Sequence, residues 1–110
     1  MTYRLVVYSN PADGREDEYN DWYTNIHLPE VCAVPGVKSA TRIKLTAPMG
    51  PWGSAFRYAA IYEVDAEDPT TVVKEIGRRV AGGEMRMSDS MNPVAEMALF
   101  EDVAHFPAKG

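Results

Sequence analysis

The sequence is poor in cysteine, in positive charge and in long apolar runs, and each shortage excludes a class of protein. The single cysteine, Cys32, rules out an intrachain disulfide, and on that ground we expect a cytoplasmic protein. Asp and Glu outnumber Lys and Arg by 16 to 11, giving a net charge of -5, which argues against binding nucleic acid or an anionic membrane. No apolar run approaches the roughly 20 residues that span a bilayer, and residues 1–10 lack the features of a signal peptide.

What is present is the composition of one small globular domain. Hydrophobic residues make up 45% and charged residues 25% of the 110 residues, which fits a single domain over residues 1–110. The predicted strands are residues 3–9, 37–46, 56–65 and 94–103, and the predicted helical segments are residues 16–27, 29–34 and 68–81. Residues 47–54, which include Trp52, are expected to form a long hairpin loop. The order βαββαβ predicts an α+β, ferredoxin-like fold with an antiparallel sheet and two helices on one face.

Both faces of the predicted strands carry apolar residues. In residues 56–65, Tyr62 and Ile61 lie on opposite faces, and in residues 94–103 Leu99 and Phe100 do the same. Two helices cover only one face of such a sheet, so the other face would be left apolar and open. We therefore expect a homodimer in which a two-fold axis packs the open faces together.

Helix-forming and helix-breaking signals meet at His27. The apolar stripe before it has the spacing of one buried helix face and consists of Tyr19, Trp22, Tyr23 and Ile26. Pro29 lacks an N–H and its ring crowds the carbonyl of Asn25, which predicts that the helix stops near His27 and that a short second piece begins at Pro29. His27 would then border a cavity, where a histidine can give or take a proton near neutral pH. The alternative is a structural histidine favoured by the dipole at a helix C-terminus.

Several aromatic residues, one arginine and one methionine are further candidates for a ligand site. Tyr23 or Tyr62 could position an oxyanion beside His27. The candidate substrate-binding residues are Tyr8, Trp22, Tyr58, Arg42 and Met97. For most of the aromatic residues the alternative is plain core packing. Arg42 could pair with a substrate carboxylate or phenolate, or be a solvated charge on an edge strand. The methionines at 85, 87, 91 and 97 could form an adaptable pocket wall or fill gaps.

The sequence favours neither a metal nor a cofactor. His27 and Glu30 are three residues apart, but no further group supplies the third and fourth ligands of a stable metal site. Cys32 has no basic neighbour in sequence and is expected to be a small buried hydrophobe. No glycine-rich phosphate loop precedes a helix.

Residues 19–43 resemble the EthD-like family, which is named for a protein associated with ethyl tert-butyl ether degradation and belongs to the dimeric α/β-barrel superfamily. The matching features are an aromatic helix, His27-x-Pro29, and Pro35-Gly36 opening a strand that carries Arg42. The resemblance implies two sheets packed face to face in a dimer, with a ligand cleft between sheet and helices in each subunit. It also implies a proton-transfer role for His27 and leaves the partner tyrosine open.

Three functions are consistent with these residues. The first is a cofactor-independent enzyme that acts on an aromatic, polyketide-like or lactone substrate by histidine acid/base chemistry, as a cyclase, isomerase or decarboxylase. The second is a cofactor-free monooxygenase of phenols. The third is a non-catalytic accessory protein that binds a hydrophobic metabolite for a degradation pathway.

Overall fold

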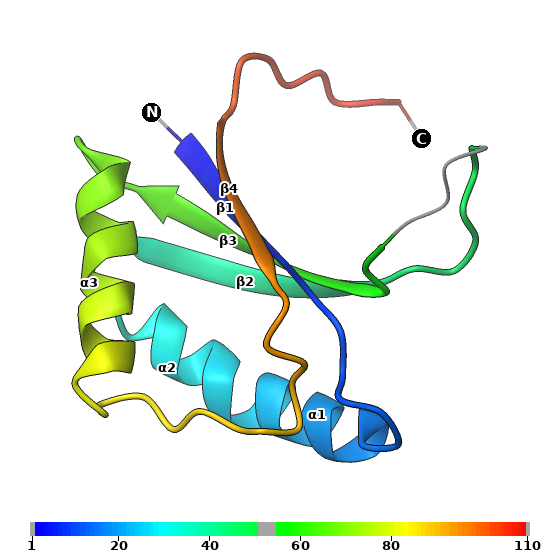
Figure 1. Ribbon diagram of the computed structural model, residues 1–110. Helices are drawn as coiled ribbons and strands as arrows, with labels where there is room; N and C mark the ends of the chain where they lie inside the picture. The colour runs from blue at the N-terminus through cyan, green and yellow to red at the C-terminus, as the bar shows by residue number, and fades with distance from the viewer. Residues whose placement is uncertain (1, 51–54, 110) are drawn as a thin grey trace.

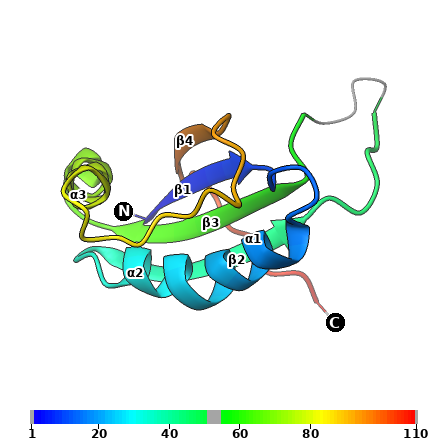
Figure 2. The ribbon, with the colours of Figure 1, turned by 60° about the horizontal axis from the view of Figure 1, so that its bottom comes forward.

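The fold is a four-stranded antiparallel sheet covered by helices on one face (Figures 1 and 2). A computed structural model describes residues 2–50 and 55–109. The strands are β1 (Thr2–Ser9), β2 (Val37–Lys44), β3 (Tyr58–Asp65) and β4 (Glu96–Glu101). The helices are α1 (Glu16–Trp22), η1 (Tyr23–His27), α2 (Leu28–Cys32) and α3 (Pro69–Ala81). The spatial order β2-β3-β1-β4 confirms the predicted ferredoxin-like α+β fold.

The predicted elements differ from the observed ones mainly at their ends. β2 stops at Lys44, β3 starts only at Tyr58, and β4 is shorter at both ends than predicted. Alternation in the sequence continues beyond the last backbone pairing, so pattern alone overestimates strand length. The predicted loop at 47–54 is described only in part, and Trp52 lies outside the described residues.

The predicted break between His27 and Pro29 is wrong, because the chain stays helical from Glu16 to Cys32. Leu28 has φ -56° and ψ -49°, which is helical and not extended. Its N–H bonds to the carbonyl of Tyr23, five residues back, so η1 is a π turn. This wider turn lies directly before Pro29, where a regular α-helix would bring the proline ring against the carbonyl of Asn25. The extra residue in the turn lets the helix pass the proline without ending.

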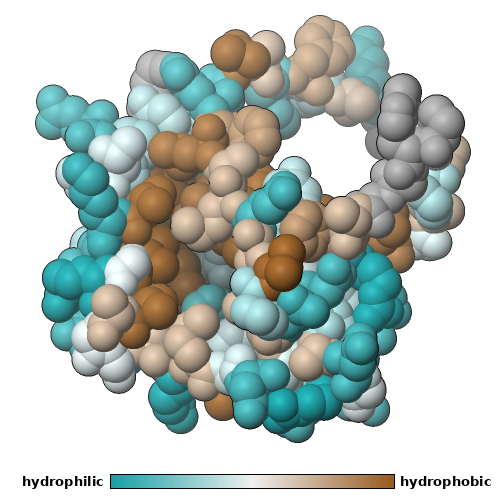
Figure 3. Space-filling model, viewed as in Figure 1, coloured by the Kyte–Doolittle hydropathy of each residue, from teal (hydrophilic) through white to brown (hydrophobic). Residues whose placement is uncertain are grey.

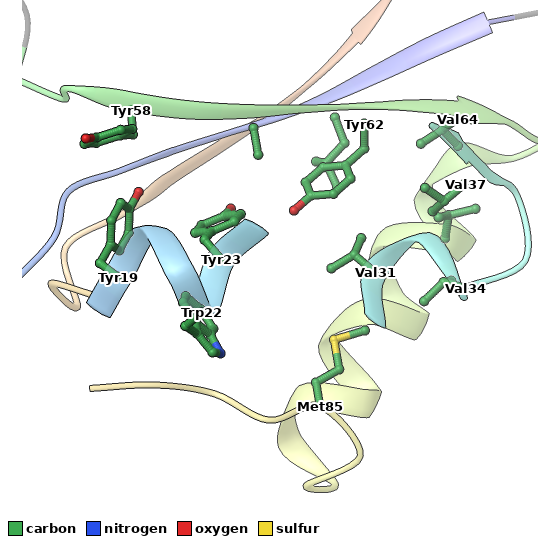
Figure 4. Close-up of a cluster of buried hydrophobic side chains, with 13 residues drawn as sticks. Tyr19, Trp22, Tyr23, Val31, Val34, Val37, Tyr58, Tyr62, Val64 and Met85 are labelled. Carbon is green, nitrogen blue, oxygen red and sulfur yellow. The ribbon is translucent and has the colours of Figure 1, made fainter. Parts of the chain in front are cut away.

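The core lies between the sheet and the helices and is rich in tyrosine (Figure 4). On this face Leu5 of β1 pairs with Tyr62 of β3 on one side and with Leu99 of β4 on the other. The Tyr19 hydroxyl is fully buried and lies 2.6 Å from Ser9 Oγ, so its polar atom is satisfied. The buried core residues shared by helices and sheet include Leu5, Tyr19, Trp22, Tyr23, Val31, Tyr58, Tyr62, Val64 and Val72.

The opposite face of the sheet, which we call the outer face, is covered by none of the described helices (Figure 2). The strand register places on it Val6, Tyr8, Ile43, Ala59, Ile61, Ala98 and Phe100. Phe100 is 50% exposed and Ile43 is 49% exposed. Polar residues such as Arg4 and Glu63 are interspersed among them. The outer face is thus more apolar than a sheet surface that lies in water.

Residues 82–95, which we call the crossing segment, run from α3 past α2 and back to β4 (Figure 1). Trp22 Nε1 donates to the carbonyl of Arg86 at 2.6 Å, and the Glu30 carboxylate accepts from the N–H of Arg86 at 3.1 Å. Further along, the N–H of Ala12 bonds to the carbonyl of Ser90 at 2.7 Å. These bonds hold an irregular segment in a fixed path beside the helices.

Candidate functional site

An apolar cavity of about 350 Å³ lies between the sheet, α3 and the crossing segment. Figure 3 shows its opening as a brown, apolar hollow between α3 and the chain leading into β4. Its wall combines strand, helix and crossing-segment residues and consists mainly of Leu5, Val7, Val31, Val73, Ile76, Val80, Met87, Met91 and Met97, together with Tyr23, His27 and Tyr62. The volume is at the lower end of the range found for small-molecule sites.

Three polar atoms in the cavity wall make no hydrogen bond of normal geometry with the described residues: the hydroxyls of Tyr23 and Tyr62 and Nδ1 of His27. The two hydroxyls are close enough to interact with each other. All three are buried. A buried polar group without a partner costs about 1–3 kcal/mol, so such groups are uncommon in folded proteins. Three of them in one apolar cavity form a set of hydrogen-bonding positions available to a ligand.

The π turn explains how His27 comes to this position. The imidazole stacks on the ring of Trp22, five residues back, with centroids 4.8 Å apart and an interplanar angle of 21°. It also meets the ring of Tyr23 edge-on at 5.0 Å. A π turn brings residues i and i+5 together, whereas a regular α-helix pairs residues three and four apart. Because helix continues to Cys32, His27 is not at a helix C-terminus, and the dipole does not account for it.

Burial lowers the pKa of His27 from 6.5 to about 4, and the nearby Glu30 carboxylate only partly opposes this. The imidazole is therefore neutral at pH 7, and a neutral imidazole has one nitrogen that can accept a proton. Burial also raises the pKa of both Tyr23 and Tyr62, so both phenols keep their protons and remain hydrogen-bond donors. The site thus contains one base and two neutral donors.

The lowered pKa of His27 predicts a loss of stability in mild acid. The unfolded chain takes up this proton as the pH falls through 6.5, but the folded chain takes it up only near 4. Stability therefore falls as the pH drops through this window, by at most about 3 kcal/mol from this group. Urea unfolding of His27→Gln at several pH values should show a flatter dependence than that of the unchanged protein.

The matched control for this measurement is His105→Gln, since His105 lies after β4 and is exposed. It should keep the full dependence on pH. The acidic residues titrate in all three proteins, so their contribution cancels in the comparison. Equal slopes for His27→Gln and the unchanged protein would show that His27 titrates normally.

Arg42 lies next to the cavity tyrosines but does not line the cavity. Its Nη1 donates to Asn20 Oδ1 and Thr24 Oγ1, each at 3.0 Å, while its Nη2 is buried and has no hydrogen-bond partner among the described residues. Its guanidinium carbon lies 4.6 Å from the centroid of the Tyr23 ring, and two further tyrosine rings are within cation–π distance. The structure therefore does not show Arg42 as a solvated edge-strand charge. Its positive charge opposes the rise in the Tyr23 pKa that burial causes.

The structure brings together four of the predicted site residues and leaves four outside the cavity. His27, Tyr23, Tyr62 and Met97 line it. The four outside it are Arg42, Trp22, Tyr58 and Tyr8. The ring of Trp22 stacks on the imidazole of His27, Tyr58 donates its hydroxyl proton to Glu16, and Tyr8 lies on the outer face. The roles of all these residues in binding or catalysis remain predictions.

Sequence reasoning missed the contribution of α3, which supplies Val73, Ile76 and Val80. Their spacing of three and four is the mark of an amphipathic helix, and it was available in the sequence. This spacing indicates only that the helix has one apolar face. It does not distinguish a helix that packs fully on the sheet from one that lines a cavity. Among the described residues no group of three or more His, Cys, Asp or Glu could hold a metal ion.

Solved structures match nearly the whole chain, although no protein-family model and no curated protein matches the sequence. An EthD family protein from Bacillus halodurans has a TM-score of 0.60 and 18% identity, over 94% of this chain and 100% of that one. A protein from Shewanella loihica, provisionally assigned as a monooxygenase, has a TM-score of 0.59 and 18% identity, over 94% and 96%. A dimeric ferredoxin-like protein from Thermobifida fusca has a TM-score of 0.50 and 15% identity, over 91% and 90%.

These likenesses and the sheet order place the chain in the ferredoxin-like class of α+β proteins, with an apolar cavity between sheet and helices. Within that class its fold is that of EthD family proteins, so the predicted resemblance is confirmed as a likeness of fold. Fold does not determine substrate or reaction, which must be argued from the site. None of the helices within residues 2–50 and 55–109 is long and apolar enough to cross a membrane.

Proposed function

We propose that this protein is a cofactor-independent enzyme that binds an aromatic, polyketide-like or lactone substrate in the apolar cavity and moves a proton with His27. The observation that carries the proposal is the set of three unpartnered polar atoms in one apolar cavity. A neutral imidazole at pH 7 acts as a general base, and the two phenols hydrogen-bond the substrate oxygen on which charge develops. Cyclisation, isomerisation and decarboxylation all need such a step.

The experiment compares turnover by the unchanged protein, His27→Gln and His105→Gln across uncharged aromatic ketones, phenols and lactones. Removing one positioned acid/base group typically slows a reaction about 10²–10⁴-fold. We expect a loss of that size in His27→Gln and none in His105→Gln, whose altered residue is exposed and follows β4. Full activity in His27→Gln on a substrate that the protein turns over would contradict the proposed role.

Monooxygenation of a phenol is the second candidate, and the similarity to the Shewanella loihica protein favours it. It differs from the first in consuming oxygen. An oxygen electrode run during the same turnover assays separates the two, because a cyclase, isomerase or decarboxylase takes up none. An accessory protein, the third candidate, would bind ligands from the panel and convert none.

We further propose that two copies pack through their outer faces. The exposed apolar residues on that face and the dimeric state of the Thermobifida fusca protein support this arrangement. The C-terminal residues 102–109 add to the exposed apolar surface, with Val103 95% and Phe106 92% exposed on an extended segment (Figure 1). The same proposal treats residues 1–110 as one domain of a cytoplasmic protein.

A further inference from the structure

Among the described residues, the cavity wall contains hydrogen-bonding groups but no charged side chain at pH 7. The described wall has no Lys, Arg, Asp or Glu, and its one histidine is neutral at pH 7. The guanidinium of Arg42 lies outside this wall, over the tyrosine rings, and is held by Asn20 and Thr24. A carboxylate placed in this cavity would lose its hydration without gaining a counter-charge in the wall, which is strongly unfavourable.

The two tyrosine hydroxyls are placed to act on one atom. Tyr23 comes from the π turn and Tyr62 from β3, and Figure 4 shows the Tyr62 hydroxyl directed toward Tyr23. The two phenols are close enough for each to shift the pKa of the other. Both keep their protons and can donate, and their mutual contact falls short of a hydrogen bond of normal geometry, so a carbonyl oxygen between them would be the better acceptor. A carbonyl oxygen has two lone pairs and can accept both bonds.

His27 lies against Tyr23 and lines the same cavity. Its ring meets the Tyr23 ring edge-on at 5.0 Å, and its Nδ1 is buried and without a partner among the described residues. With its proton on Nε2, the neutral imidazole presents a lone pair at Nδ1. A base close to two donors suits the removal of a proton from a carbon next to a carbonyl group.

We propose that the substrate is an uncharged ketone, ester or lactone with a C–H bond next to the carbonyl, whose oxygen is held between the hydroxyls of Tyr23 and Tyr62. Nδ1 of His27 takes the proton from that carbon. The C–H electron pair becomes the new C=C bond, and the C=O π pair moves to the oxygen, which accepts hydrogen bonds from both phenols. The imidazolium then returns its proton to carbon or oxygen. The proton-removal part of this inference rests on the proposed function, whereas recognition of the carbonyl does not.

Binding of three compounds of similar shape tests the recognition of a carbonyl. They are tetralin, which has no polar atom, β-tetralone, which adds one carbonyl, and the carboxylate of tetrahydro-β-naphthoic acid. We expect the ketone to bind at least about fivefold more tightly than the other two, since one satisfied buried group is worth about 1–3 kcal/mol. Tyr23→Phe and Tyr62→Phe should each remove most of the preference for the ketone over tetralin. Tyr3→Phe, altered on β1 outside the cavity wall, should leave it unchanged.

Deuterium exchange of β-tetralone in D₂O, followed by proton NMR, tests the chemical step without knowledge of the natural substrate. The unchanged protein and His105→Gln should accelerate exchange at the carbons next to the carbonyl, and His27→Gln should not. Equal binding of ketone and tetralin, tighter binding of the carboxylate, or binding of none of the three would overturn the carbonyl inference. Preferential ketone binding without exchange would support carbonyl recognition and contradict the proton-transfer role of His27.

Discussion

The proposed packing of two outer faces predicts that Phe100→Asp sediments as a monomer at concentrations at which the unchanged protein sediments as a dimer. Phe100 lies on β4, faces away from the helices and is 50% exposed. In a two-fold dimer the substitution enters the interface twice, and it places two unpaired carboxylates in apolar surroundings. Truncating or mispairing a buried interfacial group typically costs about 2–5 kcal/mol, so we expect the dissociation constant to rise by more than about a hundredfold.

Met49→Asp is the matched control, because Met49 is equally apolar and 94% exposed but lies in the loop after β2. It should leave the dimer intact, while circular dichroism confirms that both variants are folded. Sedimentation of the unchanged protein as a monomer at about 10 μM would defeat the dimer proposal directly, since stable homodimers remain associated at such concentrations.

The second large effect concerns Gly36, in the turn between α2 and β2. Gly36 has φ +98°, and a Cβ added there would lie 2.8 Å from Cγ2 of the buried Val72 on α3. Gly36→Ala therefore combines backbone strain of about 1–2 kcal/mol with overpacking of about 1–3 kcal/mol. We expect a loss of about 3 kcal/mol in the free energy of unfolding, measured by urea denaturation.

Two other glycines separate these contributions. Gly14 has φ +74° but a Cβ added there would meet no atom within 4 Å, so Gly14→Ala should show the strain alone. Gly77 lies within α3 with open space around it, and Gly77→Ala should be neutral or stabilising by up to about 1 kcal/mol. A loss in Gly36→Ala no larger than that in Gly14→Ala would show that α3 moves aside to accommodate the methyl group.

The fold was predictable because alternation and helical spacing agree along most of the chain. The same patterns pointed to His27, Tyr23 and Tyr62, which line one cavity, and their roles stay predictions. Two features could not be predicted from these sequence patterns. Local rules treat Pro29 as a helix breaker, and the π turn that avoids the break depends on an i+5 bond that sequence spacing does not signal. Periodicity assigns Arg42 to a face of β2, but only three-dimensional packing places Asn20, Thr24 and the tyrosine rings around it.

The π turn amounts to one additional residue inserted into a helix. The insertion changes the rotational phase between the part of the helix before it and the part after it, while each part keeps its own contacts with the sheet. Trp22 anchors the first part to the crossing segment, and Val31 packs the second part into the core. A related chain that lacked this one residue could therefore keep the same sheet and core and yet point its histidine elsewhere. We therefore expect that, among proteins of this fold, a length difference of a single residue in this helix changes where its histidine points.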